Sequence, residues 1–120
     1  VPVVRLDDLV GEDVPVLIKI DVEGHELAVL RGGQQTLADP RLLAVIMETN
    51  GSGSRYGVSD DLLTGVMREN GFAPFGYDPF ARRLVVAAAN SANTVFVRDR
   101  AAVESRAGSA PTFRLVNGEI

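Results

Sequence analysis

The 120-residue sequence contains no cysteine. This absence excludes a disulfide framework, a cysteine-ligated zinc site and a thiol nucleophile. The sequence also lacks an apolar run near the roughly 18 residues that a membrane-spanning helix needs, and no signal-peptide pattern opens it. We therefore expect no membrane partner and a cytoplasmic location.

Basic residues are scarce as well. Lys and Arg number 12 against 16 Asp and Glu, which gives a net charge of −4, and the one adjacent arginine pair is Arg82–Arg83. Proteins that bind nucleic acid neutralise its phosphates with a basic surface, so we expect no nucleic-acid partner. A composition that is 46% hydrophobic and 23% charged is typical of a globular domain.

Two apolar segments predict the centre of the fold. Residues 16–22 (VLIKIDV) and 42–48 (LLAVIME) are almost continuously apolar, as strands buried on both faces of a parallel sheet are. A helical pattern lies between them, and Gly32–Gly33 is expected to break or kink it. A second helix is predicted over 59–70, with Ser59 as its N-cap.

The rest of the chain completes an α/β prediction. Residues 72–77 and 82–88 flank a turn and predict a hairpin-like excursion, and 93–99 is a strong strand, expected to be antiparallel. Residues 112–119 (TFRLVNGE) form either a short edge strand or nothing regular. The order β–α–β–α–β predicts a mostly parallel sheet with both crossover helices on one face.

Acidic residues stand where the predicted strands end. Asp21 and Glu23 lie at or just past the end of the first strand, Glu48 ends the second, and His25 lies at a helix start. Ligands bind beyond the carboxyl ends of strands in open parallel sheets, so these residues are the candidate site. Carboxylates crowded together have perturbed pKa values, as functional sites often do.

Neighbouring charges have simpler interpretations. Glu26 fits a helix first turn, where an acid complements the helix dipole. Lys19 lies within the strand and needs a partner, which is either Asp21 or another segment. A neutral imidazole at His25 can act as a base, although many such histidines are only surface residues.

Three segments resemble one enzyme family. The stretches VRLDDLV (4–10) and IKIDVEGHELAVLRGG (18–33), followed by a strand ending in Glu48, closely resemble the FkbM-type methyltransferases. The resemblance covers about residues 4–98 in order. Members of that family transfer a methyl group from S-adenosylmethionine, typically to a hydroxyl oxygen of a small molecule or glycan.

The resemblance implies a fold and roles. It implies a Rossmann-like methyltransferase fold, with Asp21 at the cofactor and with Asp21 and Glu23 where the methyl group meets its acceptor. Asp21 or His25 would then remove the acceptor's proton, and Glu48 would position the hydroxyl.

The chain departs from the family in one large respect. No glycine-rich loop follows any predicted strand, and no ribose-binding acid follows a second one, although the family's cofactor site uses both. Because the chain also begins at Val1, we expect a carboxyl-terminal half, with strands four to seven of a seven-stranded sheet. Residues 1–99 would be the partial domain and 100–120 a partly irregular extension. We expect the isolated chain to be inactive.

Two other functions stay open at this point. One is a non-catalytic α/β module kept for binding or assembly, for which an absent glycine loop is expected. The other is a metal-dependent enzyme that uses Asp21, Glu23, Glu48 and His25, because a hard cation such as magnesium suits carboxylate ligands.

A half-sheet also has exposed surfaces. The sheet face opposite the crossover helices and the free edge of strand 16–22 would normally be covered by the other half of the domain. Exposed apolar faces and open strand edges drive association. We therefore expect the chain to form a homodimer.

Overall fold

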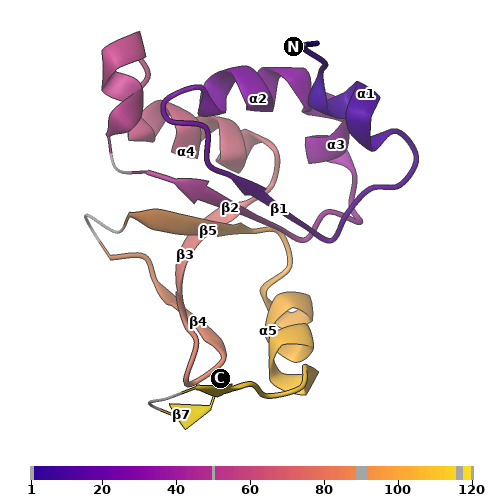
Figure 1. The fold of residues 1–120 in the computed structure, drawn as a ribbon, viewed down its shortest axis with the longest axis vertical. Helices are drawn as coiled ribbons and strands as arrows, with labels where there is room; N and C mark the ends of the chain where they lie inside the picture. Colours follow the sequence, from indigo (N-terminus) through magenta and orange to yellow (C-terminus); the bar gives the residue numbers. More distant parts are fainter. Residues whose placement is uncertain (1, 50, 89–91, 116–117, 120) are drawn as a thin grey trace.

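The computed structural model describes residues 2–49, 51–88, 92–115 and 118–119 (Figure 1). The helices are α1 (Leu6–Val10), α2 (Glu26–Gly32), α3 (Gln34–Ala38), α4 (Asp60–Glu69) and α5 (Arg100–Ser109), with a short 3₁₀ helix η1 (Ser52–Tyr56). The strands are β1 (Leu17–Ile20), β2 (Ala44–Glu48), β3 (Ala73–Asp78), β4 (Arg83–Val86), β5 (Asn93–Val97), β6 (Arg114–Leu115) and β7 (Gly118–Glu119). The α/β class is thus confirmed.

The main sheet is mixed. Its five strands follow the order β1-β2-β5-β3-β4, in which β1 and β2 are parallel. Strand β5 pairs antiparallel with both β2 and β3, and β4 pairs antiparallel with β3 (Figure 1). The prediction of a mostly parallel sheet is therefore wrong, whereas the antiparallel strand near the carboxyl terminus and the hairpin are confirmed.

The position of β5 has a physical reason. Phe96 and Val97 are 0% and 2% exposed, so β5 gains most from an interior place between two strands. Its ladder with β2 spans the whole of both strands, from Ala44 opposite Val97 to Glu48 opposite Asn93. Strand β3 lies next outward, and its Pro74, which has no N–H to donate, is paired only with β5, because the ladder with β4 begins at Phe75.

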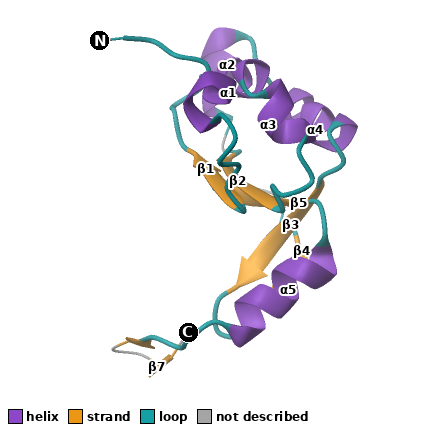
Figure 2. Ribbon diagram, turned by 90° about the vertical axis from the view of Figure 1, so that its right-hand side faces the viewer, coloured by secondary structure: helices purple, strands orange, loops and turns teal. Residues whose placement is uncertain are grey.

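The helices form layers on both faces of the sheet. Helices α1 to α4 lie on one face and α5 lies on the other (Figure 2). Side chains of α2, α3 and α4 pack with β1, β2 and β5 in the main core, whose fully buried members include Leu30, Leu37, Val45, Met47 and Phe96. The placement of both crossover segments on one face is confirmed. A smaller cluster of Ala44, Leu84 and Val97 packs with Val103 of α5.

The glycine pair breaks the first crossover into two helices, as predicted. Helix α2 ends at Gly32, and Gly33 is the N-cap residue of α3. A Cβ atom on Gly33 would lie 2.6 Å from Leu6 Cδ2 and 3.3 Å from Leu6 Cβ, so a larger residue there would displace Leu6. Helix α3 therefore has no capping side chain at its own N-cap position.

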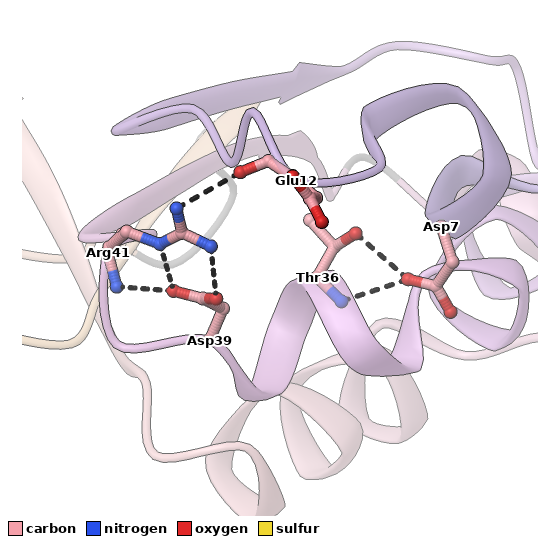
Figure 3. Close-up of polar contacts among 5 residues, drawn as sticks. All are labelled: Asp7, Glu12, Thr36, Asp39 and Arg41. Carbon is pink, nitrogen blue, oxygen red and sulfur yellow. Dashed lines mark hydrogen bonds and ion pairs between the residues drawn. The ribbon is translucent and has the colours of Figure 1, made fainter.

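Asp7 of α1 supplies that cap instead. Its carboxylate accepts a hydrogen bond from Gln35 N at 3.2 Å. It also accepts from Thr36 N at 2.9 Å and from Thr36 Oγ1 at 2.8 Å (Figure 3). Burial acts to raise the pKa of Asp7, but the bonds from Thr36 and Gln35 outweigh it and the pKa is lowered. The same figure shows Arg41, which donates to the Asp39 carboxylate and to the Glu12 carbonyl, and its side chain lowers the pKa of Asp39 to about 2.

Arg98, just after β5, holds the end of α3 to the sheet. Its guanidinium donates to the carbonyl oxygens of Leu37 and Leu42, the second at 3.1 Å, and lies 4.4 Å from the Phe72 ring centre. We expect Arg98→Met, which keeps the aliphatic packing, to lower the free energy of unfolding by about 2 kcal/mol, because both carbonyls lose a charged donor. Urea unfolding would measure this. Arg106→Met is the control at an exposed arginine, and an equal effect of the two changes would contradict the role.

The carboxyl-terminal part is more regular than its composition suggests. Residues Arg100–Ser109 form a helix that the sequence pattern does not predict. The Asp99 side chain caps it and accepts from Ala102 N at 3.0 Å. Strands β6 and β7 pair with each other as a separate two-stranded unit, so the described residues of 112–119 include regular structure but not the predicted single edge strand. Residues 116–117 of that range lie outside the described residues. Among the described residues, no helix is long and apolar enough to cross a membrane.

Candidate active site

Asp21, Glu23 and Glu48 meet at one end of the parallel pair, and we call them the acidic rim. Ile20 of β1 stands opposite Met47 of β2, so the next residues, Asp21 and Glu48, leave the two strands side by side. One carboxylate oxygen from each of the three acids lies within 4.8 Å of the others. The parallel strands thus bring Asp21 and Glu48, which are 27 positions apart in the sequence, to the same edge of the sheet.

An unusual turn carries Asp21 and Glu23 out of β1. Glu23 has a φ of +50° and Gly24 a φ of +96°, two consecutive residues in the left-handed region. That conformation costs a non-glycine residue about 1–2 kcal/mol, which the surroundings must offset. The offset comes partly from Glu26, only 1% exposed, whose Oε1 accepts from Gly24 N at 3.1 Å. His25 N also donates to the Val22 carbonyl at 3.3 Å.

The rim acids differ in their charge environment. Lys19 Nζ lies 2.5 Å from Asp21 Oδ2, which identifies the partner that a lysine within a strand requires. Both side chains are about half exposed, so the pair adds little to stability. Burial raises the pKa of Glu48, and the charges of Glu23 and Asp21 raise it further. Glu48 is therefore suited to hold a proton.

Residues 1–74, which include the whole acidic rim, match the Methyltransferase FkbM domain. The chain belongs to the FkbM methyltransferase family. Neither a curated protein nor a solved structure matches it. The matched span lies at the amino-terminal end of this FkbM chain, so it gives no support to the expectation that only the family's carboxyl-terminal part is present.

His25 lies apart from the acidic rim of this FkbM chain. Among the described residues, the group of close acidic and histidine side chains contains the three rim acids and not His25. The imidazole instead packs on the ring of Tyr56, with ring centres 4.6 Å apart and planes tilted by 55°. Four candidate residues were named from the sequence, and the structure brings together three of them.

Two residues near the site were not recognised from sequence. The sequence predicts only a dipole-complementing role for Glu26, but its side chain is buried and holds the turn. Its spacing of two residues after Gly24, within the FkbM stretch DVEGHE, was the available signal. Tyr56 had no signal of its own, because only the fold brings η1 against the start of α2.

Proposed function

We propose that this chain carries the acceptor side of an S-adenosylmethionine-dependent O-methyltransferase acting on a hydroxyl of a small molecule or glycan. The single observation that carries the proposal is the acidic rim: three carboxylates within 4.8 Å at the carboxyl ends of parallel strands, inside the span that matches the FkbM domain. Such strand ends are where open α/β sheets bind their ligands.

The donor set of the rim suits the cationic end of S-adenosylmethionine. The sulfonium and ammonium groups of S-adenosylmethionine carry positive charge, and the carboxylates of Asp21 and Glu23 are exposed. When bound, the cofactor supplies the methyl group. The sequence has no glycine-rich turn after a strand, so we propose that a preceding half of the domain holds the rest of the cofactor.

Glu48 and Asp21 have separate roles toward the acceptor hydroxyl, which are proton removal and orientation. Methyl transfer to a hydroxyl requires that the oxygen lose its proton, and a carboxylate with a raised pKa accepts a proton at less cost. Glu48 has that property and is the proposed general base. Asp21, fixed by Lys19, orients the hydroxyl beside it. This assignment revises the expectation that Asp21 or His25 is the base.

Asp21→Asn tests the orienting role in the full-length protein. The change keeps the shape of the side chain but removes the charge that pairs with Lys19, and we expect methyl transfer to fall about tenfold through loss of alignment. The assay follows tritiated methyl transfer from S-adenosylmethionine to a panel of hydroxylated acceptors. Asp39→Asn is the control, because Asp39 pairs with Arg41 outside the rim. Unchanged turnover with unchanged cofactor affinity would contradict the role.

A divalent-cation enzyme is the second candidate, favoured by the same close grouping of carboxylate oxygens. Hard cations such as Mg²⁺ take oxygen ligands, and binding one would relieve the repulsion among the acids. This candidate predicts that millimolar MgCl₂ raises the thermal midpoint of the wild-type chain and does not raise that of Glu48→Gln. Equal responses of both proteins would exclude it. Cytoplasmic location and the homodimer stay predictions.

A further inference from the structure

A hollow beside the acidic rim has the features of a ligand site. It has a volume of about 360 Å³ and lies between α2 and the segment that contains Tyr56 and Val58. Gly24 and His25 line it where α2 begins, and Arg31 lines it in the last turn of α2. Gly24 directly follows Glu23 in the turn after β1, so the hollow begins at the residue next to the acidic rim, although none of the three rim acids lines it. Its volume lies within the range of small-molecule sites.

The aromatic side of the hollow consists of His25 and Tyr56, and Tyr56 is positioned by His25 but stays exposed to solvent. His25 packs against Tyr56 at a tilt of 55°, and Tyr56 nevertheless remains 59% exposed. Aromatic faces carry partial negative charge, which attracts the partially positive C–H bonds on the face of a sugar ring. A tyrosine that is positioned by a neighbour and still exposed suits stacking of that kind.

Arg31 provides the opposite charge to the rim. Arg5, Arg41 and Arg100 each pair with a carboxylate, whereas Arg31 makes no ion pair or side-chain hydrogen bond with any described residue. A guanidinium binds a carboxylate through two parallel hydrogen bonds. At 1.5 Å of rise per residue, Arg31 lies about 9 Å along α2 from His25, roughly the length of two sugar rings. The acids at one end and the arginine at the other would orient an anionic ligand.

We propose that this hollow binds the methyl acceptor, and that the acceptor is an acidic carbohydrate whose carboxylate pairs with Arg31 while a sugar ring stacks on Tyr56. The carboxylate then lies at the far end from the acidic rim, where it avoids repulsion, and a hydroxyl of the neighbouring ring is directed toward the rim. This assignment rests on the proposed function and adds the class of acceptor to it.

The test is a calorimetric titration with two sugars that differ only in charge. Cellobiouronic acid carries a carboxylate where cellobiose carries a hydroxymethyl group. The proteins are the 120-residue chain, Arg31→Ala and Arg68→Ala. Arg68 is the matched control, because it is also an exposed arginine in the last turn of a helix but does not line the hollow. The chain has two tyrosines and no tryptophan, so in a Tyr77→Phe background the emission reports on Tyr56 alone.

We expect cellobiouronic acid to bind roughly tenfold to a hundredfold more tightly than cellobiose, with loss of that difference in Arg31→Ala but not in Arg68→Ala. Binding should also change Tyr56 emission. The proposal is overturned by equal affinity for both sugars, by no binding of either, by equal effects of the two arginine changes, or by binding that leaves Tyr56 emission unchanged. Since the titration contains no methyl donor, its failure would leave the proposed methyl transfer intact, and a lack of methyl transfer would leave the sugar binding intact.

Discussion

Glu48→Gln is expected to lower methyl transfer by the full-length protein about 10²–10⁴-fold and, at pH 7, to raise the thermal midpoint of unfolding. The rate falls because glutamine cannot accept the proton of the acceptor hydroxyl. The midpoint rises because the change removes a partly buried charge that Glu23 and Asp21 repel. Loss of function with gain of stability is the signature of a residue kept for chemistry.

The pH dependence follows from the direction of the pKa shift. The pKa of Glu48 is raised above its ordinary value of 4.5, so the folded chain holds this proton more tightly than the unfolded chain. The resulting stabilisation is complete below 4.5 and is lost as the pH rises through the raised value. The advantage of Glu48→Gln should therefore be present at pH 7 and disappear in acid.

Glu104→Gln is the matched control for this prediction. The Arg100 side chain and Leu84 N bond the Glu104 carboxylate and lower its pKa, so the same substitution there should lower the midpoint at pH 7 and leave methyl transfer unchanged. Scanning calorimetry between pH 3 and pH 7 and the tritium assay provide the two readouts. A Glu48→Gln protein that is destabilised at pH 7, or fully active, would contradict the assignment.

Asp7→Ala is expected to lower the free energy of unfolding by about 2–3 kcal/mol. The Asp7 side chain is 5% exposed and accepts three hydrogen bonds from α3, so its removal takes the acceptor from Gln35 N and leaves the two donors of Thr36, a residue only 3% exposed, with poor access to water. Helix α3 cannot replace this cap, since Leu6 occupies the space that a side chain at Gly33 would need. The cost is a large part of the 5–15 kcal/mol that typically stabilises a domain.

Urea unfolding of Asp7→Ala and Asp8→Ala measures this effect. Asp8 is the neighbouring exposed acid of the same helix and should change stability by no more than about 0.5 kcal/mol. Because the folded pKa of Asp7 is lowered, its contribution is present above 3.8, the ordinary value, and is lost as the pH falls through the lowered value. Equal unfolding midpoints for the two variants at pH 7 would refute the capping role.

The local hydrophobic pattern of the sequence is sufficient to predict the two strands that position the acidic rim. The apolar runs predicted β1 and β2, and their parallel pairing follows from the helical crossover between them. Once those strands are neighbours, residues that end them share one edge, which is why Asp21 and Glu48 could be named from sequence. Ser59 as N-cap of α4, with its Oγ accepting from Leu62 N at 3.2 Å, is equally local.

Features that depend on contacts between residues far apart in the sequence could not be predicted from local pattern. Strand β5 lies between β2 and β3 because that position buries its apolar side chains best. The hydrophobic periodicity of a single segment does not show which strands will be its neighbours. Asp7 and Glu26 look like ordinary first-turn acids in the sequence, and only the packing of α1 on α3, or of the turn after β1, gives them their roles. Helix α5 was missed because its Ala-, Ser- and Gly-containing sequence shows little amphipathic periodicity.

Calorimetric titration of S-adenosylmethionine into the 120-residue chain, beside a chain extended at its amino terminus, distinguishes a methyltransferase from a non-catalytic module. We expect binding to the extended chain alone, because the proposed role of the acidic rim is to contact only the methyl-bearing end of the cofactor. Binding to the short chain would show that the cofactor site is placed wrongly. Binding to neither would contradict the methyltransferase account and leave a non-catalytic binding module in its place.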